Sequence, residues 1–576
     1  MSTRFTRRRV LALAAAGGIA AGLLGSRGSA LAAPAQTYTI ANVGAYGGEP
    51  SIASDGNGVL YDSTPSGGLL VYRSTDHGAS WTAATTPDPA SGDSCLATDQ
   101  SNAVYACNLA GSQGKAPLQA DVWKSTNQGS TWAHGQGAVA DQCGTSCSPF
   151  GVDRQWTAAS IPTGGTAATA EVVLMYHDFY GPSQIWVNIS HDGGATFGAP
   201  QEVLASPAVT PGAVTGTLTA EGYTFCNTVP TGVGIVKPGL VHAGRMYVSW
   251  VASDLPSDAL GCNISQAESF HTLWVSYSDD NGVTWTPQQA FDAGVGHDAS
   301  TPFAAFTLDD QGNPYIAFAA NHWDPSPTTN LANTARCAAE STAGTVQTDF
   351  ACEYDMYVVW SQDGGATWDG GGGTILGSAA APYQVNPVGE TGTHWFPAIA
   401  VSDPGQVDVA YLHTGEILPT DPAGKADPGG CAGPIKGNPP TFPPACHWDL
   451  YAGQSLNLTS SPATATWTTA DLTGPMPMHI GDICNLGIAC GPTSNRNLLD
   501  FIQEAVDPTT GCAHIAYADD NTVNLLRVAN QTAGCLTIPG ANIAETPWAA
   551  LFVPAGAVAA LAARRIRRRG QPANFA

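Results

Sequence analysis

The chain has 576 residues, with 46 acidic and 21 basic side chains and a formal net charge of −25 at pH 7. Ten of the basic residues lie in the terminal segments 1–32 and 547–576, whereas every acidic residue lies between them. The central part therefore sets 46 negative against 11 positive side chains. This charge excludes nucleic acid and anionic membranes as its partners, and it disfavours an anionic substrate unless arginines are focused at one place.

The first 32 residues have the three parts of an export signal. Arg7, Arg8 and Arg9 precede an apolar run over residues 10–24, and Ala30-Leu31-Ala32 forms a small-x-small cleavage signal. The arginines resemble a twin-arginine signal, although Val10 stands where Phe is preferred. We therefore predict that residues 1–32 are a signal peptide and that the body folds outside the cytoplasm.

One short loop recurs through the body, with the pattern Ser-x-Asp/Asn-x-Gly-x-x-aromatic. A worn sixth copy runs over 455–467, and the five clear copies are residues 74–81, 125–132, 190–197, 278–285 and 361–368. The pattern is typical of a hairpin turn, because the Asp or Asn caps backbone N–H groups, Gly adopts a positive φ and the aromatic ring folds back onto the sheet. Irregular spacing indicates similar hairpins with variable insertions.

A second element, a turn followed by a short apolar strand with a tyrosine, precedes these loops. The seven tyrosines are Tyr61, Tyr105, Tyr176, Tyr247, Tyr315, Tyr411 and Tyr517. One strand before each turn, one after the tyrosine strand and one after the loop complete four antiparallel strands, which is a propeller blade. We predict an all-β fold, a seven-bladed β-propeller over residues 37–540, with residues 37–43 supplying the missing strand of the last blade.

The recurring loop resembles the Asp-box, or BNR, repeat of sialidases and other β-propellers. The resemblance implies the propeller fold, with six blades as the alternative because sialidases have six. It also implies an arginine triad, a Tyr nucleophile with a Glu partner, and an acidic Asp. The Phe/Tyr-Arg-Ile-Pro motif that carries the first arginine in sialidases is absent here. The mature body contains only Arg73, Arg154, Arg245, Arg336, Arg496 and Arg527.

Long insertions rich in Pro, Gly and Cys follow the middle blades, at 206–228, 253–270, 322–353, 414–446 and 475–495. All 14 cysteines lie in the body, and their even number predicts disulfides between sequence neighbours, such as Cys95 with Cys107 and Cys484 with Cys490. Metal binding by Cys143 and Cys147 is the alternative, but no second pair at zinc spacing accompanies them. The insertions should form a stapled rim on one face.

The chain ends with an uncharged stretch over 547–563 and a basic tail over 564–576 that contains five arginines. Seventeen residues reach the lower limit for spanning a bilayer, and the arginine cluster should stay cytoplasmic. We predict a single-pass C-terminal anchor that holds the body at the extracellular face of a bacterial membrane or cell envelope. A sorting signal that is cut off after delivery and a buried terminal helix are the alternatives.

The starts of the innermost strands meet at one axial mouth in a propeller, and this is where we expect the functional site. Glu49, Asp153, Asp298 and Asp500 are the candidate catalytic carboxylates. The candidate ligand-binding residues are Arg154, Arg496, Trp156, His394 and Trp395. Arginines and carboxylates hold hydroxyl or acid groups, and aromatic faces stack on sugar rings. The alternative is that these charges pair with one another and close the central tunnel.

These observations predict an exported propeller that recognises a glycan or a cell-envelope ligand at its axial mouth and is monomeric. An active glycoside hydrolase is the alternative, in which two carboxylates face each other across a sugar bond and one of them is protonated. A structural role in the envelope comes third. No cofactor is predicted, and a structural calcium ion is left open.

Overall fold

The computed structural model describes residues 35–89, 91–110, 119–136, 152–178, 185–203, 217–218, 223–256, 270–293, 299, 303–321, 354–369, 382–416, 446–459, 465–481, 483, 496–521 and 523–536. The signal peptide, the 547–563 stretch, the basic tail and Asp298 lie outside the described residues. Within the described part of the chain, no helix is long and apolar enough to cross a membrane.

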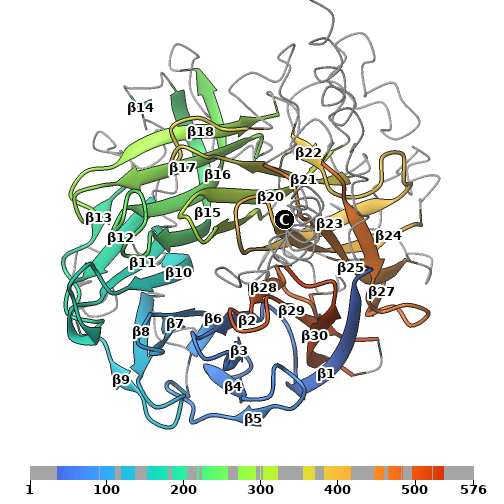
Figure 1. The fold of residues 1–576 in the computed structure, drawn as a ribbon, viewed down its shortest axis with the longest axis horizontal. Helices are drawn as coiled ribbons and strands as arrows, with labels where there is room; N and C mark the ends of the chain where they lie inside the picture. Colours follow the sequence, from blue (N-terminus) through green and yellow to red (C-terminus); the bar gives the residue numbers. More distant parts are fainter. Residues whose placement is uncertain are drawn as a thin grey trace, which may run out of the picture.

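Seven antiparallel sheets stand around one axis, which confirms the seven-bladed propeller and excludes the six-bladed alternative (Figure 1). The first three sheets, from the axis outward, are β2 (Ser51–Ser54), β3 (Leu60–Thr64), β4 (Leu70–Ser74) and β5 (Thr82–Ala83); β6 (Ser91–Thr98), β7 (Val104–Ala110), β8 (Gln119–Ser125) and β9 (Ala133–His134); and β10 (Val152–Ser160), β11 (Glu171–Asp178), β12 (Ile185–Ser190) and β13 (Gln201–Glu202). A short 3-10 helix, Ala167–Thr169, precedes β11.

The fourth to sixth sheets follow the same order, with small additions. They are β15 (Tyr223–Ile235), β16 (Met246–Pro256), β17 (Thr272–Ser278) and β18 (Thr286–Asp292), with β14 (Thr217–Leu218) beside β15; β19 (Ala305–Leu308), β20 (Pro314–Asn321), β21 (Tyr354–Trp360) and β22 (Tyr383–Gln384); and β23 (Thr393–Val401), β24 (Val407–Thr414), β25 (His447–Ser455) and β26 (Thr468–Asp471), with β27 (His479–Ile480) beside β25.

The seventh sheet joins the two ends of the propeller. Its inner strands are β28 (Gln503–Val506), β29 (Ala513–Asp519) and β30 (Leu525–Ala533), and its outer strand is β1 (Thr37–Ala45) from the beginning of the chain. β1 pairs with β30 in antiparallel register from Thr37 opposite Ala533 to Ala45 opposite Leu525, and Figure 1 shows the two strands side by side. This confirms the predicted closure, which leaves β30 without an open edge.

The recurring loops connect the third and fourth strands of their blades. In the loop after β12, Asp192 Oδ1 accepts hydrogen bonds from the Ser190 hydroxyl (2.8 Å) and the Thr196 N–H (2.8 Å). Ser190 Oγ in turn accepts the Gly194 N–H (2.9 Å). Loops after β4, β17 and β21 repeat this set of bonds. The Asp therefore organises the turn, as the pattern predicts.

The recurring tyrosines are core residues. All seven are at most 2 % exposed, and each lies in its blade's second strand. In the second blade, Asp99 caps its turn through the Ser101 N–H (2.8 Å) and also accepts the Tyr105 hydroxyl (2.9 Å). Asp55 with Tyr61 and Asp309 with Tyr315 repeat this link. In these three blades, the spacing between turn and tyrosine follows from this shared carboxylate.

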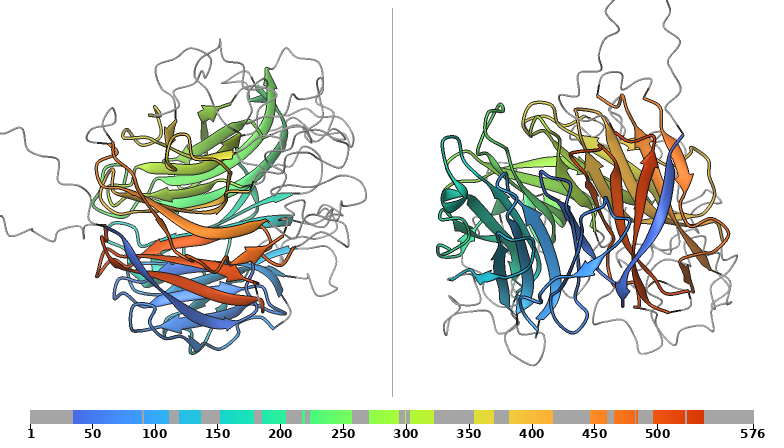
Figure 2. Two further views of the ribbon diagram at one scale, coloured as in Figure 1. Left: turned by 90° about the vertical axis from the view of Figure 1, so that its right-hand side faces the viewer. Right: turned by 60° about the horizontal axis from the view of Figure 1, so that its bottom comes forward.

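The hydrophobic core lies between neighbouring sheets, which pack face to face around the ring (Figure 2). Between the second and third blades, for example, Tyr105 and Val122 pack against Val172 and Leu174. A disulfide between Cys95 and Cys107 joins register partners in β6 and β7 and confirms that predicted pair. Cys512 and Cys535, also sequence neighbours, form another disulfide, and Cys484 and Cys490 lie outside the described residues.

Candidate functional site at the axial mouth

β-bulges at the beginning of the inner strands aim side chains toward the axis. The pairing of β10 with β11 shifts between Asp153 and Trp156, and that of β23 with β24 shifts between Trp395 and Ala398. Arg154 and Phe396 occupy these bulges with φ values of 55° and 52°. A bulge changes the direction of a side chain without ending the strand, so it places Arg154 where the regular pleat would not.

Arg154 is the centre of an ion-pair network that joins the first, third and seventh blades. Its Nη1 donates a hydrogen bond to Glu49 Oε1 at 3.3 Å, and its Nη2 donates one to Asp500 Oδ2. Its Nε lies 3.9 Å from Asp153 Oδ2. Arg496 also binds Asp500, with Nη2 3.0 Å from Oδ2. We name Glu49, Asp93, Asp153, Arg154, Arg496 and Asp500 the mouth cluster.

The mouth cluster has a buried base, Asp500 and Glu49, and a partly exposed rim, Asp153 and Arg496. The side chains of Asp500 and Glu49 are 0 % and 3 % exposed, whereas those of Asp153 and Arg496 are 19 % and 25 % exposed. The buried Glu49 and Asp500 both pair with Arg154, as expected if these charges close the central tunnel. The rim members keep solvent-accessible polar atoms that a ligand can reach.

The carboxyl groups of the mouth cluster have unequal proton affinities. Burial, then the charges of Asp93 and Asp500, raises the pKa of Glu49 well above its ordinary value. Burial and the charge of Asp153 raise the pKa of Asp93 to about 6. Burial has the same tendency at Asp500, but Arg154 and Arg496 outweigh it and lower its pKa. Glu49 therefore holds a proton more strongly than Asp500 does.

Aromatic side chains lie directly beneath the cluster. The Arg154 guanidinium carbon lies 4.5 Å from the centre of the Phe303 ring, a cation–π contact. Phe303 packs edge-on against Phe501 at 5.9 Å, and Phe501 contacts Trp156 at 5.4 Å. The rings hold the guanidinium in place from below and separate the mouth from the channel.

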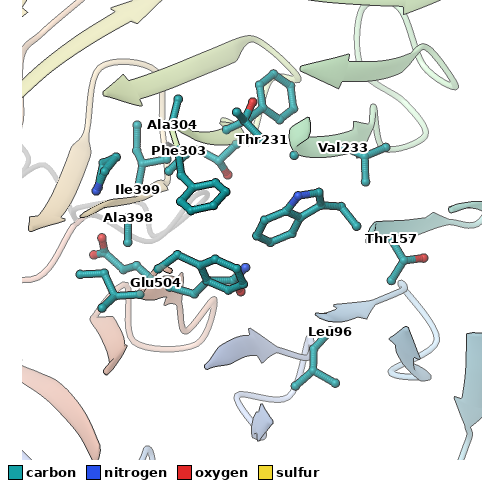
Figure 3. A pocket seen from close by; sticks show the side chains of 18 residues that line it. Leu96, Thr157, Thr231, Val233, Phe303, Ala304, Ala398, Ile399 and Glu504 are labelled. Carbon is teal, nitrogen blue, oxygen red and sulfur yellow. The ribbon is translucent and has the colours of Figure 1, made fainter. Parts of the chain in front are cut away.

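A cavity of about 160 Å³ follows these rings along the axis, lined by the inner strands of the second to seventh blades. Figure 3 shows Phe303, Ile399 and Glu504 among the side chains that line it. A second cavity, of about 260 Å³, shares Thr307, Ile399 and Glu504 with the first, so the two follow one another along the channel.

Glu504 belongs to a second group of buried carboxyls that the sequence interpretation did not single out. Its side chain and that of Asp408 lie within hydrogen-bonding reach, and Asp408 Oδ2 also accepts from Tyr38 (3.3 Å) and Gln454 (3.1 Å). Burial raises the pKa of Asp408 to about 7 and that of Glu504 well above its ordinary value. The signal for this group in the sequence was Glu504, a charged residue within an inner strand that faces the axis.

The structure brings Glu49, Asp153, Arg154, Arg496 and Asp500 together, and it places Trp156 in the cavity wall beneath them. Trp395 lies in the core, 1 % exposed and packed against Tyr354 with ring centres 4.9 Å apart. His394 is fully buried beside Glu390. Phe303 and Phe501 were missed, although Phe501 directly follows the candidate Asp500 and Phe303 lies five residues after the candidate Asp298.

Neither a protein-family profile nor a curated protein sequence matches this chain. Among solved structures, an ulvan lyase described as a new family of polysaccharide lyase is similar, with 13% identity, 86% of this chain and 95% of that chain covered, and a TM-score of 0.43. An α-L-arabinofuranosidase of Fusarium graminearum (10% identity, 86% and 98% covered, TM-score 0.36) and a leech intramolecular trans-sialidase (11%, 85% and 68%, 0.33) are also similar. These likenesses are too distant to assign residues or chemistry.

Proposed function

We propose that the axial mouth binds an uncharged glycan through the rim of the mouth cluster. The observation that carries the proposal is the combination of the partly exposed Asp153 and Arg496 side chains with a fixed, buried ion-pair base. A carboxylate and a guanidinium at fixed positions accept from and donate to sugar hydroxyls. Ligand binding does not have to order the side chains of the base, because Glu49, Arg154 and Asp500 already hold one another in place.

An uncharged ligand fits the charges better than an acidic one. The mouth cluster has four carboxyl groups and two guanidinium groups, and both guanidinium groups already bind Asp500. A sialic acid carboxylate would have to displace Asp500 from its arginines and would meet Asp153 at the rim. Hydroxyl groups avoid both costs, which favours neutral sugars.

Glycoside hydrolysis is the second candidate function, and the separated pKa values of the carboxyl groups favour it. Glu49, with its raised pKa, matches a general acid, and Asp500, with its lowered pKa, matches a base or nucleophile. Glu49 is only 3 % exposed, however, so a glycosidic oxygen would reach it only after the mouth opens. This is why binding is proposed first.

The test is a neutral-glycan array probed with the wild type, Asp153→Asn, Arg496→Gln and the control Val283→Ala, at a residue that is 72 % exposed in the loop after β17 and lines neither cavity. We expect the retained glycan to bind at least about tenfold more weakly to both mouth variants, since each loses one polar contact worth about 1.5 kcal/mol or more, and unchanged to Val283→Ala. Failure of the mouth variants to differ from the control would refute the site. Product release from fluorogenic glycosides, abolished by Glu49→Gln, would instead establish the hydrolase.

We further propose that the protein works at the cell envelope, held there by residues 547–563. The signal peptide pattern, the disulfides and the arginine tail support this location. Fractionation of cells that produce the full chain and a variant ending at residue 546 tests it. The full chain should sediment with membranes, and the shortened chain should appear in the medium.

A further inference from the structure

Three side chains with metal-binding atoms meet at the beginning of β23. His394 on β23 and His413 on β24 are direct register partners, and their rings stack 4.6 Å apart at an interplanar angle of 20°. Glu390 lies four residues before His394, in the turn closed by its own N–H bonding to Pro387 O (3.0 Å). One ligand atom from each residue lies within 4.8 Å of the others.

A neutral His394 ring accounts for only one of its two nitrogen contacts. Nδ1 lies 2.8 Å from Tyr354 O, and because a carbonyl only accepts, Nδ1 must carry the proton. Nε2 of a neutral ring then has a lone pair, yet it lies 3.1 Å from Glu390 Oε2, which is another acceptor. Either a proton, on the ring or on the carboxyl group, joins the two atoms, or a cation lies between the nitrogen and the carboxylate.

His413 also has one ring nitrogen against a backbone carbonyl. Its Nε2 lies 3.3 Å from Thr391 O, so this nitrogen is the donor and Nδ1 keeps the lone pair. Backbone carbonyls thus fix the tautomers of both histidines. Metal-binding histidines are generally oriented in this way, with the second ring nitrogen donating to a carbonyl or carboxylate.

We propose that Glu390, His394 and His413 bind a divalent transition metal ion, for which zinc is the best match. Two imidazoles and one carboxylate are a three-ligand zinc set that leaves a fourth position for water. Ligand atoms about 2.1 Å from zinc lie roughly 3.4 Å apart. His394 Nε2 and Glu390 Oε2 already lie 3.1 Å apart, so the adjustment falls on His413, whose ring must turn out of its stack with His394 to face the ion. Its 3.3 Å contact with Thr391 O is the longer of the two histidine–carbonyl contacts, and Glu390, in a turn and 25 % exposed, can follow the movement.

The His447 and Glu416 pair offers a matched control. His447 Nδ1 lies 2.9 Å from Glu416 Oε1, so it repeats the histidine–carboxylate contact at a more exposed place. Among the described residues, Glu390, His394 and His413 are the three-residue metal group that is found, and His447 and Glu416 are not part of one. Replacement of His447 therefore removes a similar ion pair without removing a metal ligand.

The test uses the full protein without a histidine tag, stripped with EDTA, dialysed and titrated with Zn²⁺. The wild type should take up one zinc per chain and, with Co²⁺, should show visible d–d absorption. Glu390→Gln and His413→Gln should each weaken zinc binding by about 10- to 100-fold, whereas His447→Gln should not. Circular dichroism confirms that the variants fold.

Two results would overturn the proposal. The first is a wild type that takes up no stoichiometric zinc and shows no cobalt absorption, which would leave a proton between His394 and Glu390 as the explanation of their contact. The second is zinc binding that both variants retain at wild-type strength. Neither result bears on the axial mouth, because the array test depends on Asp153 and Arg496 and not on these three residues.

Discussion

Arg154 and Asp500 are 346 residues apart in the chain, yet Arg154 Nη2 donates a hydrogen bond to Asp500 Oδ2 across the axis of the propeller. Asp500 is fully buried, and Arg496, four residues before it, binds the same carboxylate. The contact therefore ties the third blade to the seventh, while Glu49 adds the first. Ring closure by β1 and the ion pairs at the mouth are two separate links between the ends of the propeller.

Replacement of Arg154 by alanine should strongly destabilise the protein. It leaves the buried Asp500 and Glu49 side chains without their shared cation, and breaking a buried ion pair from one side costs about 3–5 kcal/mol. Urea unfolding followed by tryptophan fluorescence measures the change. Lys237→Ala removes a surface pair with Asp310 and should cost less than about 1 kcal/mol. Equal midpoints for the two variants would contradict the role assigned to Arg154.

The sequence predicts the ring better than it predicts the mouth. Blade number, ring closure and the role of the recurring loops follow from local patterns. Asp192 bonds to residues two and four positions away in its own loop, and Tyr105 bonds to Asp99 in the turn before its strand. The mouth depends on bulges that no local pattern reveals. One extra residue at Arg154 changes where its side chain points, and the equivalent shift after Trp395 accompanies the burial of that ring in the core.

The buried pair of Asp408 and Glu504 should make stability depend on pH. The folded-state pKa of Asp408, raised by burial to about 7, lies above its ordinary value of 3.8, so the folded state binds more protons between these values. Its contribution to stability is fully present below about pH 4 and is lost as the pH rises through 7. Each pKa unit corresponds to about 1.4 kcal/mol, so the loss amounts to a few kcal/mol at most.

Asp408→Asn tests this dependence, because an amide keeps the hydrogen bonds but does not titrate. The difference in unfolding free energy between wild type and variant, measured by urea titration at intervals from pH 4 to 8, should move steadily in favour of the variant. Carboxylates away from this pair titrate alike in both proteins and cancel in the difference. Glu504 does not cancel, because Asp408 helps to raise its pKa, and the loss of that effect in the variant shifts the difference in the same direction. A difference that stays constant across this range would show that Asp408 does not carry the raised pKa.

Gly193 in the recurring loop after β12 should not tolerate a side chain. Its φ is 72°, and a Cβ there would lie 2.4 Å from Ala167 O, which also accepts a hydrogen bond from Lys124. Gly164 has a similar φ of 76° but open space around it. Gly164→Ala should therefore cost only the backbone term of about 1–2 kcal/mol, and Gly193→Ala clearly more. Comparable losses in thermal midpoint would mean that the close approach to Ala167 is relieved without cost.

Deletion of residues 35–45 should open the propeller. β1 forms the outer strand of the seventh sheet, and its segment also reaches the sixth blade, where Gln36 Nε2 donates to Thr468 O at 2.8 Å and Tyr38 donates to Asp408. Without β1, the backbone of β30 becomes an exposed edge that can pair with another chain. We expect loss of the cooperative unfolding transition, together with self-association seen by light scattering.

A synthetic peptide of residues 35–45 separates loss of pairing from general damage. Because β1 is the first strand of the described chain, the peptide should restore the wild-type light scattering and the unfolding transition when it is added in excess during refolding. Thr37→Val serves as the side-chain control. It removes only the exposed hydroxyl contact with Thr532 (2.9 Å) and should leave stability within about 0.5 kcal/mol. A shortened chain that scatters light like the wild type and unfolds at the same midpoint would show that the mouth ion pairs alone hold the ring closed.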